Sequence, residues 1–217
     1  MSVFTGAGVS TAAGIPDYRS GYGTVLETGP GCWEKAAFKQ KYKEDMKKAG
    51  KPLPAAYTRT FQQTIGEAKP SKTHMALVEL MNRGILKGLV SQNVDGLHRK
   101  SGIDPYKMAE VHGNTNLEMC ARCTKEHMRD YRTRTAQKVH DHKTGRICDE
   151  PGCGGQLEDS IINFGDNLND LILDKGYSIH AQSDLAICMG TSMRIPPACL
   201  MPFGAQQNGG KVVIINL

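Results

Sequence analysis

Four short apolar runs in this 217-residue chain each end in a polar or glycine-rich cluster. The runs are residues 3–4, 88–90, 185–189 and 212–215, and the clusters that follow them are residues 5–8, 91–95, 190–192 and 216–217. Helical patterns lie between the runs, and strands that alternate with helices predict a parallel, doubly wound α/β sheet. Ligands of such sheets bind beyond the carboxyl ends of the strands. The four clusters are therefore the first candidates for a binding site.

The segments between the runs predict three helices and one further strand. We expect a short strand at 161–164 and helices at 33–48, 71–84 and 169–182. Ser71 is the candidate N-cap of the second helix, which should stop at Gly84. Its expected buried residues are Leu77, Val78, Leu80 and Met81. The first helix should have a solvated lysine face and turn these residues inward: Trp33, Ala36, Ala37 and Phe38.

The composition indicates one domain with room for a small inserted lobe, because 39% of the residues are hydrophobic. The formal net charge of +5 comes from basic residues dispersed among acidic ones, which permits an acidic partner without proving one. No apolar stretch approaches the roughly 18 residues of a membrane span, and the N-terminus lacks a signal pattern. We therefore expect a soluble, intracellular protein without a membrane partner.

Four of the seven cysteines form two pairs in a segment that is rich in charge and poor in apolar residues. The pairs are Cys120 with Cys123 and Cys148 with Cys153. Four thiolates in two such turns predict a closed, tetrahedral zinc site with no open position for catalysis. We favour structural zinc over disulfides or free thiols, since clustered cysteines without a secretory signal are more often metal ligands.

A glycine-rich turn, Gly6-Ala7-Gly8-Val9-Ser10, follows the first apolar run and precedes small residues that suit the start of a helix. Such a turn lets backbone N–H groups approach a pyrophosphate. The signal is weak alone, and a dinucleotide dehydrogenase would need a second strand ending in Asp or Glu about 20 residues on. Residues 21–27 contain no convincing strand, which argues against hydride transfer.

Polar side chains that could face a ligand occur at two further places. Asp17 and Arg19 could contact a ligand, or could form an ion pair in a surface turn. Gln92, Asn93 and Asp95 follow the second apolar run and offer donors and acceptors suited to ribose hydroxyls and a carboxamide. The same residues could equally cap a helix that follows them.

His112 lies in a short strand that ends at Gly113, a position from which an imidazole could face a cleft. Histidine is the usual general base near neutral pH, although a lone histidine is more often structural. Both interpretations stay open from the residue alone. We expect the following histidines to be structural or solvated: His98, His127, His140 and His142.

Taken in order, these pieces resemble the sirtuins, the NAD-dependent protein deacylases. The resemblance is carried by residues 5–19, 92–98, 111–114, 190–192 and 216–217 and by the two cysteine pairs, and it spans nearly the whole chain. It implies a Rossmann-like sheet with an inserted zinc module, NAD as co-substrate and structural Zn²⁺. Residues 15–19, 134–135, 144–148 and 157–161 are similar to the class IV branch of nuclear, chromatin-associated deacylases. Acyl-lysine partners such as histone tails, chromatin association and a nuclear location are therefore implied.

The resemblance also implies roles for single residues. The NAD phosphates would lie on Gly6, Ala7, Gly8 and Ser10, and the nicotinamide side would be bordered by Asp17, Tyr18 and Arg19. The nicotinamide ribose and carboxamide would be held by Gln92, Asn93 and Asp95. The adenosine half would contact Gly190, Thr191 and Ser192, and the adenine end Asn216 and Leu217. His112 and Asn93 would be the catalytic residues.

The implied reaction consumes NAD. The acyl oxygen of an acyl-lysine attacks the ribose carbon that bears nicotinamide, and nicotinamide leaves. His112 then acts as the general base on a ribose hydroxyl, and free lysine and O-acyl-ADP-ribose result. The backbone of the substrate would pair beside Asn163-Phe164-Gly165 by β-addition. Asp166 stands where many relatives carry Glu.

Two alternatives remain at this point. Protein mono-ADP-ribosyl transfer would use the same site, and the sequence cannot separate it from deacylation. A non-catalytic, zinc-bearing adaptor could instead bind chromatin or nucleic acid through an arginine surface, although it would not need His112 together with the polar residues of 92–95. The arginines of that surface are Arg122, Arg129, Arg132 and Arg134.

We expect a single catalytic domain over residues 1–217. Its large lobe should comprise 1–25, 71–117 and 158–217, with a variable segment at 26–70 and a zinc module at 118–157. By resemblance, the chain stops before the usual final residues of the cofactor site, and its first strand is short. Weak activity is therefore expected.

Overall fold

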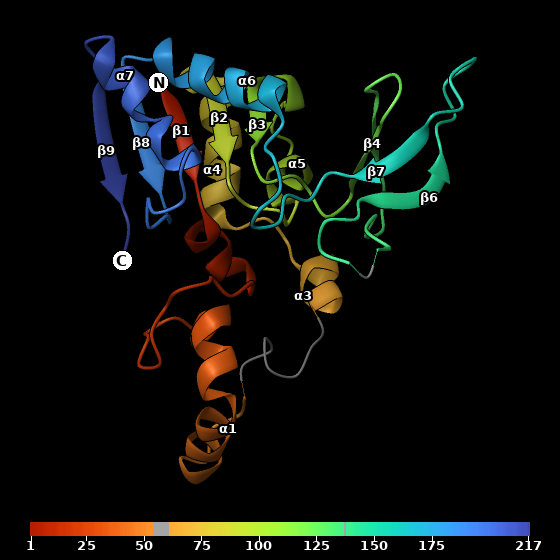
Figure 1. Ribbon diagram of the computed structural model, residues 1–217. Helices are drawn as coiled ribbons and strands as arrows, with labels where there is room; N and C mark the ends of the chain where they lie inside the picture. The colour runs from red at the N-terminus through yellow and green to blue at the C-terminus, as the bar shows by residue number, and fades with distance from the viewer. Residues whose placement is uncertain (54–60, 137) are drawn as a thin grey trace.

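Five parallel strands form the main sheet, in the order β3-β2-β1-β8-β9. The computed structural model describes residues 1–53, 61–136 and 138–217 (Figure 1). The strands are β1 (Ser2–Thr5), β2 (Gly88–Ser91), β3 (Met108–Glu110), β8 (Leu185–Met189) and β9 (Lys211–Ile215). Every pairing in this sheet is parallel. The four apolar runs are therefore strands, and the predicted parallel sheet is confirmed.

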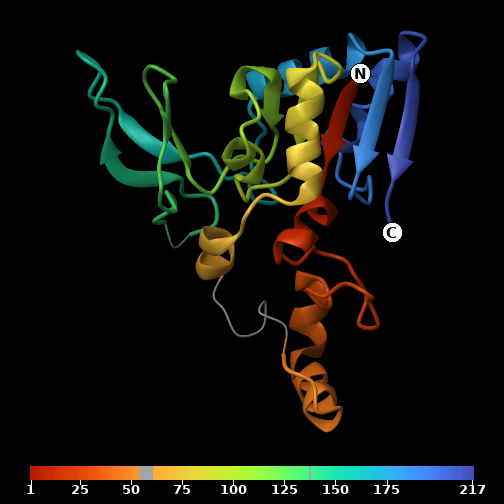
Figure 2. The same ribbon diagram turned by 180° about the vertical axis from the view of Figure 1, so that it is seen from behind.

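Helices pack on both faces of this sheet. Successive side chains of a strand point to opposite faces, so neighbouring residues of β1 contact different helices. Val3 packs with Leu77 of α4 (Lys72–Asn82), whereas Phe4 packs against residues of α6 (Asp170–Ala181). Figure 2 shows α4 in front of the sheet when it is seen from behind. The sheet is thus doubly wound, as the alternating pattern predicted.

The two predicted helices α4 and α6 begin and end close to the expected residues. Ser71 caps α4 in a capping box with His74, and Gly84 beyond its end has a φ of +68°. Asn169 caps α6 by accepting a hydrogen bond from the backbone N–H of Ile172. The described residues also form η1 (Ala7–Ala13), α3 (Phe61–Glu67), α5 (Leu97–Ser101), η2 (Pro105–Lys107), η3 (Ala198–Leu200) and α7 (Phe203–Gln207), besides α1 (Cys32–Lys48).

Helix α1 (Cys32–Lys48) forms where it was predicted, but the prediction of its inward face was wrong. No residue of α1 is buried, and both Trp33 (46%) and Phe38 (44%) are well exposed, as are Ala36 and Ala37. Both ribbon views show α1 extending away from the sheet. An apolar stripe turns inward only where another element covers it, and no element among the described residues buries this one.

Residues 161–164 were predicted as a strand and do not form one. The segment instead lies beside the turn that carries His112. The backbone N–H of Ile162 donates to the carbonyl of His112 at 3.1 Å. A short apolar run can pack between other elements without pairing as a strand.

No helix in the described part of the chain has the length and apolar character needed to cross a membrane.

A second, antiparallel sheet is inserted between β3 and α6, beside the main sheet (Figure 1). Its strands are β4 (Leu117–Cys120), β5 (Glu126–Met128), β6 (Lys143–Ile147) and β7 (Gln156–Asp159), in the order β5-β4-β7-β6. Its apolar cluster is small and consists mainly of Cys120, Cys148 and Leu157. Something other than an apolar core must therefore stabilise this inserted module.

A buried carboxylate is one such element. Glu118 of β4 is fully buried, and its oxygens lie 2.7 Å from Arg129 Nε and 2.7 Å from Arg146 Nη2. Burial would raise the pKa of Glu118, but the hydrogen bonds from Arg146 and Arg129 outweigh it and hold the pKa below its usual value. One carboxylate thereby joins three segments of the module.

Replacing Glu118 by Gln should lower the free energy of unfolding by about 3 kcal/mol, because two arginines lose their shared charge partner. A carboxylate whose pKa is depressed on folding stabilises above its unfolded pKa, and that contribution is lost as the pH falls through the folded pKa. Urea unfolding should therefore show the full difference at neutral pH and a smaller one below about pH 4. Glu158→Gln on the neighbouring strand β7 is the matched control and should change stability by less than about 0.5 kcal/mol.

Candidate functional site

The carboxyl ends of β1, β2, β8 and β9 border one cleft of about 1280 Å³. This volume exceeds the roughly 300–1,000 Å³ of sites for drug-sized molecules, so a dinucleotide and part of a second substrate have room. Most of the predicted site residues line it: Gly6, Ala7, Gly8, Asp17, Tyr18, Arg19, Gln92, Asn93, His112, Gly190, Thr191, Ser192, Asn216 and Leu217. The structure thus brings together residues that are up to 211 positions apart, from Gly6 to Leu217.

Two predicted residues, Ser10 and Asp95, line a smaller cavity of about 250 Å³ instead. Ala7, Tyr18 and Asn93 line both spaces, so the small cavity adjoins the main cleft. The site is therefore built of a large cleft and a side pocket.

The loops after β1 and β8 touch backbone to backbone. Gly8 N–H donates to the carbonyl of Gly190 at 2.8 Å, and a Cβ on Gly8 would lie 2.7 Å from Gly190 Cα. A Cβ on Gly6 would lie 2.7 Å from Thr191 Cβ. Glycine is therefore required at these positions by the contact between the loops. The helix expected after this turn is η1, a 3₁₀ helix of seven residues.

Side chains beyond β2 fix the loop after β1. Asn93 Nδ2 donates to the carbonyl of Gly6 at 3.0 Å, and Ser10 Oγ donates to Asp95 Oδ2 at 2.6 Å. Asp95 Oδ1 also accepts the backbone N–H of Leu97 at 2.9 Å. Asp95 thus accepts from the first residue of α5 and holds Ser10 at the same time. A helix-capping role and a role in shaping the site, which the sequence left as alternatives, are therefore compatible.

The segment after η1 closes one side of the cleft. Asp17 Oδ1 accepts the backbone N–H groups of Arg19 at 3.1 Å and Ser20 at 2.9 Å, so it shapes a turn. Arg19 Nη1 donates to Ser192 Oγ at 3.0 Å, and its guanidinium lies 4.6 Å from the centre of the Trp33 ring. The guanidinium therefore ties this segment to the loop after β8 and does not face Asp17.

His112 lies in the turn after β3, two residues beyond the end of that strand. Its Nδ1 is 3.1 Å from the carbonyl oxygen of Gln92. A carbonyl only accepts, so Nδ1 carries the proton and Nε2 keeps a free electron pair. Burial lowers the pKa of His112, while the bond to Gln92 raises it by a smaller amount. The imidazole is consequently neutral and can accept a proton at Nε2.

The four cysteines of the inserted module converge, with their sulfur atoms all within 4.8 Å of one another. Cys120 Sγ lies 3.5 Å from Cys153 Sγ, and Cys123 Sγ lies 3.7 Å from Cys148 Sγ. A tetrahedral zinc with Zn–S bonds of about 2.3 Å requires sulfur atoms about 3.8 Å apart. The backbone N–H groups of Arg122 and Cys123 also point to Cys120 Sγ, as suits a thiolate. The arrangement fits structural Zn²⁺.

His127 is a contact to this site that the sequence analysis missed. The residue is buried in β5, its Nε2 lies 3.4 Å from Cys148 Sγ, and its Nδ1 lies 3.4 Å from Asp149 Oδ1. In β5, His127 is buried between two exposed residues. In a longer strand, alternating apolar and polar residues would predict such burial, but three residues are too few to show the pattern in the sequence.

The arginine surface considered for an adaptor is largely used within the module. Arg129 pairs with Glu118, Arg134 Nη1 lies 2.9 Å from Asp159 Oδ2, and Arg122 Nη1 donates to the carbonyl of Cys153. The charges of Arg129 and Arg134 are thus paired within the module, whereas Arg122, which is bonded to a neutral carbonyl, and Arg132 are exposed.

The comparison with known proteins agrees with this site. The model of the Sir2 family matches residues 6–197. The chain belongs to the Sir2 family. It is 41% identical to the NAD-dependent protein deacetylase SRT1 of Arabidopsis thaliana, with all of this chain and 40% of that protein aligned. It is 34% identical to the NAD-dependent protein deacetylase Sirt6 of Drosophila melanogaster, covering 98% of this chain and 61% of that protein.

Among solved structures, this Sir2 family member is similar to a complex described as Sir2, p53 peptide and NAD⁺. The TM-score is 0.60 with 26% identity, and the alignment covers 99% of this chain and 80% of that chain. The chain spans less than two thirds of each of the two curated relatives named above, 40% and 61% of their lengths.

Cys148→Ala should lower the zinc content and the melting temperature together, because a site with three thiolates binds zinc weakly and metal binding is coupled to folding. Substituting cadmium, another tetrahedral thiolate binder, should preserve both fold and activity. Metal analysis and thermal unfolding check the first point, and Cys199→Ala, outside the cluster, is the control. A folded, cadmium-loaded protein that binds NAD and peptide but has lost turnover would show that the metal takes part in the chemistry.

Proposed function

We propose that this chain is the catalytic domain of an NAD-dependent protein-lysine deacylase, with residues 118–157 as its zinc module. The reaction converts NAD and an acyl-lysine into nicotinamide, O-acyl-ADP-ribose and free lysine. The observation that carries the proposal is the position of a neutral His112, with its proton on Nδ1, in the same cleft as Gln92 and Asn93. Relatives named as deacetylases support it.

The residues of the cleft divide the work by their chemistry. NAD bound there supplies an electrophilic ribose carbon with nicotinamide as its leaving group. The backbone N–H groups of the loop with Gly6 and Gly8 suit phosphates. The small cavity beside Ser10, Asn93 and Asp95 has the size and polarity for a carboxamide-bearing ring.

His112 acts as the general base at Nε2 and takes the proton of a ribose hydroxyl. The carbonyl of Gln92 keeps the ring in one orientation and favours the imidazolium that forms, because it accepts from Nδ1–H in both states. Gln92 Nε2 in turn donates to Thr191 Oγ1 at 2.8 Å, which links the base to the loop after β8.

An acyl-lysine protein is the proposed second substrate, and its extended backbone would lie beside Asn163, Phe164 and Gly165. These residues line the cleft, and Phe164 is 74% exposed, with its ring centre 6.2 Å from that of Trp33. The similarity to Sirt6 and to class IV motifs supports histone tails as substrates, chromatin as partner and the nucleus as location.

Incubation with NAD and a panel of acyl-lysine peptides tests the function, with nicotinamide and O-acyl-ADP-ribose as the measured products. Deacylated peptide together with O-acyl-ADP-ribose supports it. Release of nicotinamide without deacylated peptide would favour ADP-ribosyl transfer or glycohydrolysis and would refute the proposal.

Asn93→Ala and Asp95→Ala should each suppress both nicotinamide release and nicotinamide exchange, because the two side chains shape the cavity and the loop after β1. Asn82→Ala, at the exposed end of α4, is the control and should keep the parent rates. Cleavage of NAD at the parent rate by both site variants would mean that the nicotinamide pocket lies elsewhere.

His112→Ala should lower deacylation about 10²–10⁴-fold, the usual effect of losing a general base, while NAD binding largely survives. Because burial lowers the pKa of His112, the parent's kcat/KM should persist to a lower pH than an exposed imidazole would allow and then fall with acidity. Steady-state rates across pH and NAD binding by calorimetry are the measurements. Near-parent turnover by pure His112→Ala would remove His112 from the mechanism.

A further inference from the structure

Two histidines of the inserted module converge on Asp166, which lies between β7 and α6. His140 Nδ1 bonds to Asp166 Oδ1, and His142 Nε2 lies 3.2 Å from Asp166 Oδ2. The same Oδ2 accepts the backbone N–H of Asn163 at 2.7 Å and Asn163 Nδ2 at 2.8 Å. The Asp166 side chain is only 9% exposed. This carboxylate is therefore held from two separate parts of the chain.

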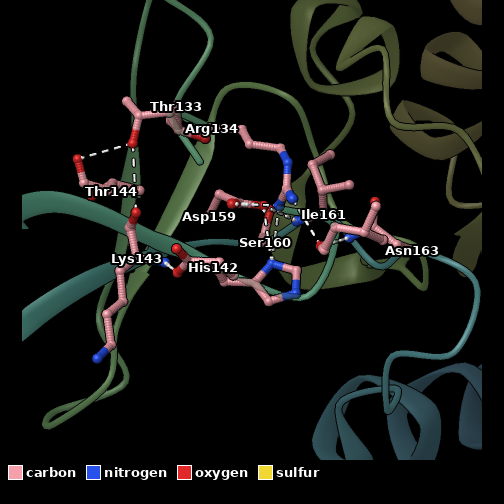
Figure 3. Close-up of polar contacts among 12 residues, drawn as sticks. Thr133, Arg134, His142, Lys143, Thr144, Asp159, Ser160, Ile161 and Asn163 are labelled. Atoms are coloured by element: carbon pink, nitrogen blue, oxygen red, sulfur yellow. Dashed lines mark hydrogen bonds and ion pairs between the residues drawn. The ribbon is translucent and has the colours of Figure 1, made fainter. Parts of the chain in front are cut away.

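His142 also connects Asp166 to a second carboxylate. Its Nδ1 lies 3.3 Å from Asp159 Oδ1, and the fully buried Asp159 side chain is paired with Arg134. Figure 3 shows Arg134 and His142 converging on Asp159. A neutral imidazole donates through one nitrogen, whereas an imidazolium donates to both carboxylates at once. The guanidinium of Arg134 also approaches this ring, with its Nη1 3.3 Å from His142 Nδ1.

The other charged groups nearby do not bond to these rings. Asp141 Oδ1 accepts the backbone N–H of Lys143 at 3.2 Å, and both side chains are exposed. Burial raises the pKa of Asp166, but hydrogen bonds from His140 and Asn163 and the charge of His142 outweigh it and hold the pKa well below its usual value. Asp166 is therefore ionised throughout the range in which imidazoles titrate.

The residues that Asp166 holds form part of the cleft wall. Asn163, Phe164, Gly165 and Asp166 all line the cleft, and Asn163 Nδ2 donates to the carbonyl of Val139, which lines it too. Gly165 has a φ of +94°, and a Cβ there would lie 3.3 Å from His140 Cε1. The histidine ring thus packs against the backbone of this segment as well as bonding to its carboxylate.

We propose that His140 and His142 are positioning residues that hold Asp166, and with it the cleft segment 163–166, in the conformation that accepts the acyl-lysine substrate. The inference rests on the proposed deacylase function and adds a regulation of the same site. The grip is firmer when the rings are charged, because each charged ring attracts the carboxylate. Substrate affinity therefore increases as the pH falls from about 8 to about 6.

Affinity for a fluorescent acetyl-lysine peptide, measured by anisotropy on the zinc-loaded protein between pH 6 and 8, is the first test. His140→Gln and His142→Gln keep a hydrogen-bond donor but cannot carry charge. Each should raise the peptide Kd at pH 6 about threefold to tenfold and make the Kd less dependent on pH. Asp141→Asn, between the two histidines but bonded to neither ring, is the matched control and should keep the parent curve.

A second test does not depend on substrate. If the two histidines hold Asp166, the backbone N–H of Asn163, which bonds to Asp166 Oδ2, should exchange with solvent faster in His140→Gln and His142→Gln than in the parent. Because His140 is 63% exposed, His140→Gln should fold. Parent-like exchange of the Asn163 N–H in both Gln variants, or a parent-like pH dependence of peptide binding in both, would overturn the proposal.

The two proposals fail separately. A parent protein that yields no deacylated peptide in the product assay refutes the deacylase function, while hydrogen exchange at Asn163 still decides whether the histidines hold Asp166. If deacylation is present but peptide affinity is independent of pH, the deacylase function stands and the positioning role of the histidines is refuted.

Discussion

The close approach of two backbone loops is the constraint on which the rest of the site depends. β1 and β8 are paired strands that end side by side, at Thr5 and Met189. Beyond them Gly8 and Gly190 meet with no room for a Cβ between them, so the two loops pack backbone to backbone. Asn93 then bonds to the carbonyl of Gly6 from the end of β2, and Arg19 bonds to Ser192 from the segment after η1. The cleft is therefore assembled by polar groups that hold one another before any ligand binds, which reduces the entropy lost on binding.

Sequence patterns predicted the main sheet well because its inner strands β1 and β2 are buried along their whole length, although the edge strand β9 is mostly exposed. A short apolar run that ends in a glycine-rich cluster has few structures open to it other than a buried strand. Strand β8 begins and ends at the predicted residues. The same logic failed for α1, where Trp33 and Phe38 stay 46% and 44% exposed although Trp33 contacts Arg19 and Phe164. It also failed at 161–164, where the N–H of Ile162 bonds to the carbonyl of His112 and Phe164 is 74% exposed, so that the segment joins no sheet.

The candidate site could be predicted only where its residues lie close together in the sequence as a motif. The glycine-rich turn, the residues of 92–95 and the cysteine pairs are local in sequence, whereas the contacts of His127, His140 and His142 depend on how the module folds. His140 and His142 were expected to be structural or solvated, because a histidine in a charged segment gives no indication of its partner. Their partner Asp166 is more than twenty residues away in the chain, on the far side of β6 and β7.

Histidines suit different roles in this cleft because their hydrogen-bond partners differ. His112 is half-buried beside the carbonyl of Gln92, and burial lowers its pKa, which suits the proton acceptor that we propose. His142 instead lies close to two carboxylates, with Nδ1 3.3 Å from Asp159 Oδ1 and Nε2 3.2 Å from Asp166 Oδ2, which suits the positioning role that we propose. A carbonyl that accepts from Nδ1–H leaves Nε2 of His112 free to take a proton, whereas both nitrogens of His142 already face a carboxylate. The partners of each ring therefore decide which of the two histidines can act as a base.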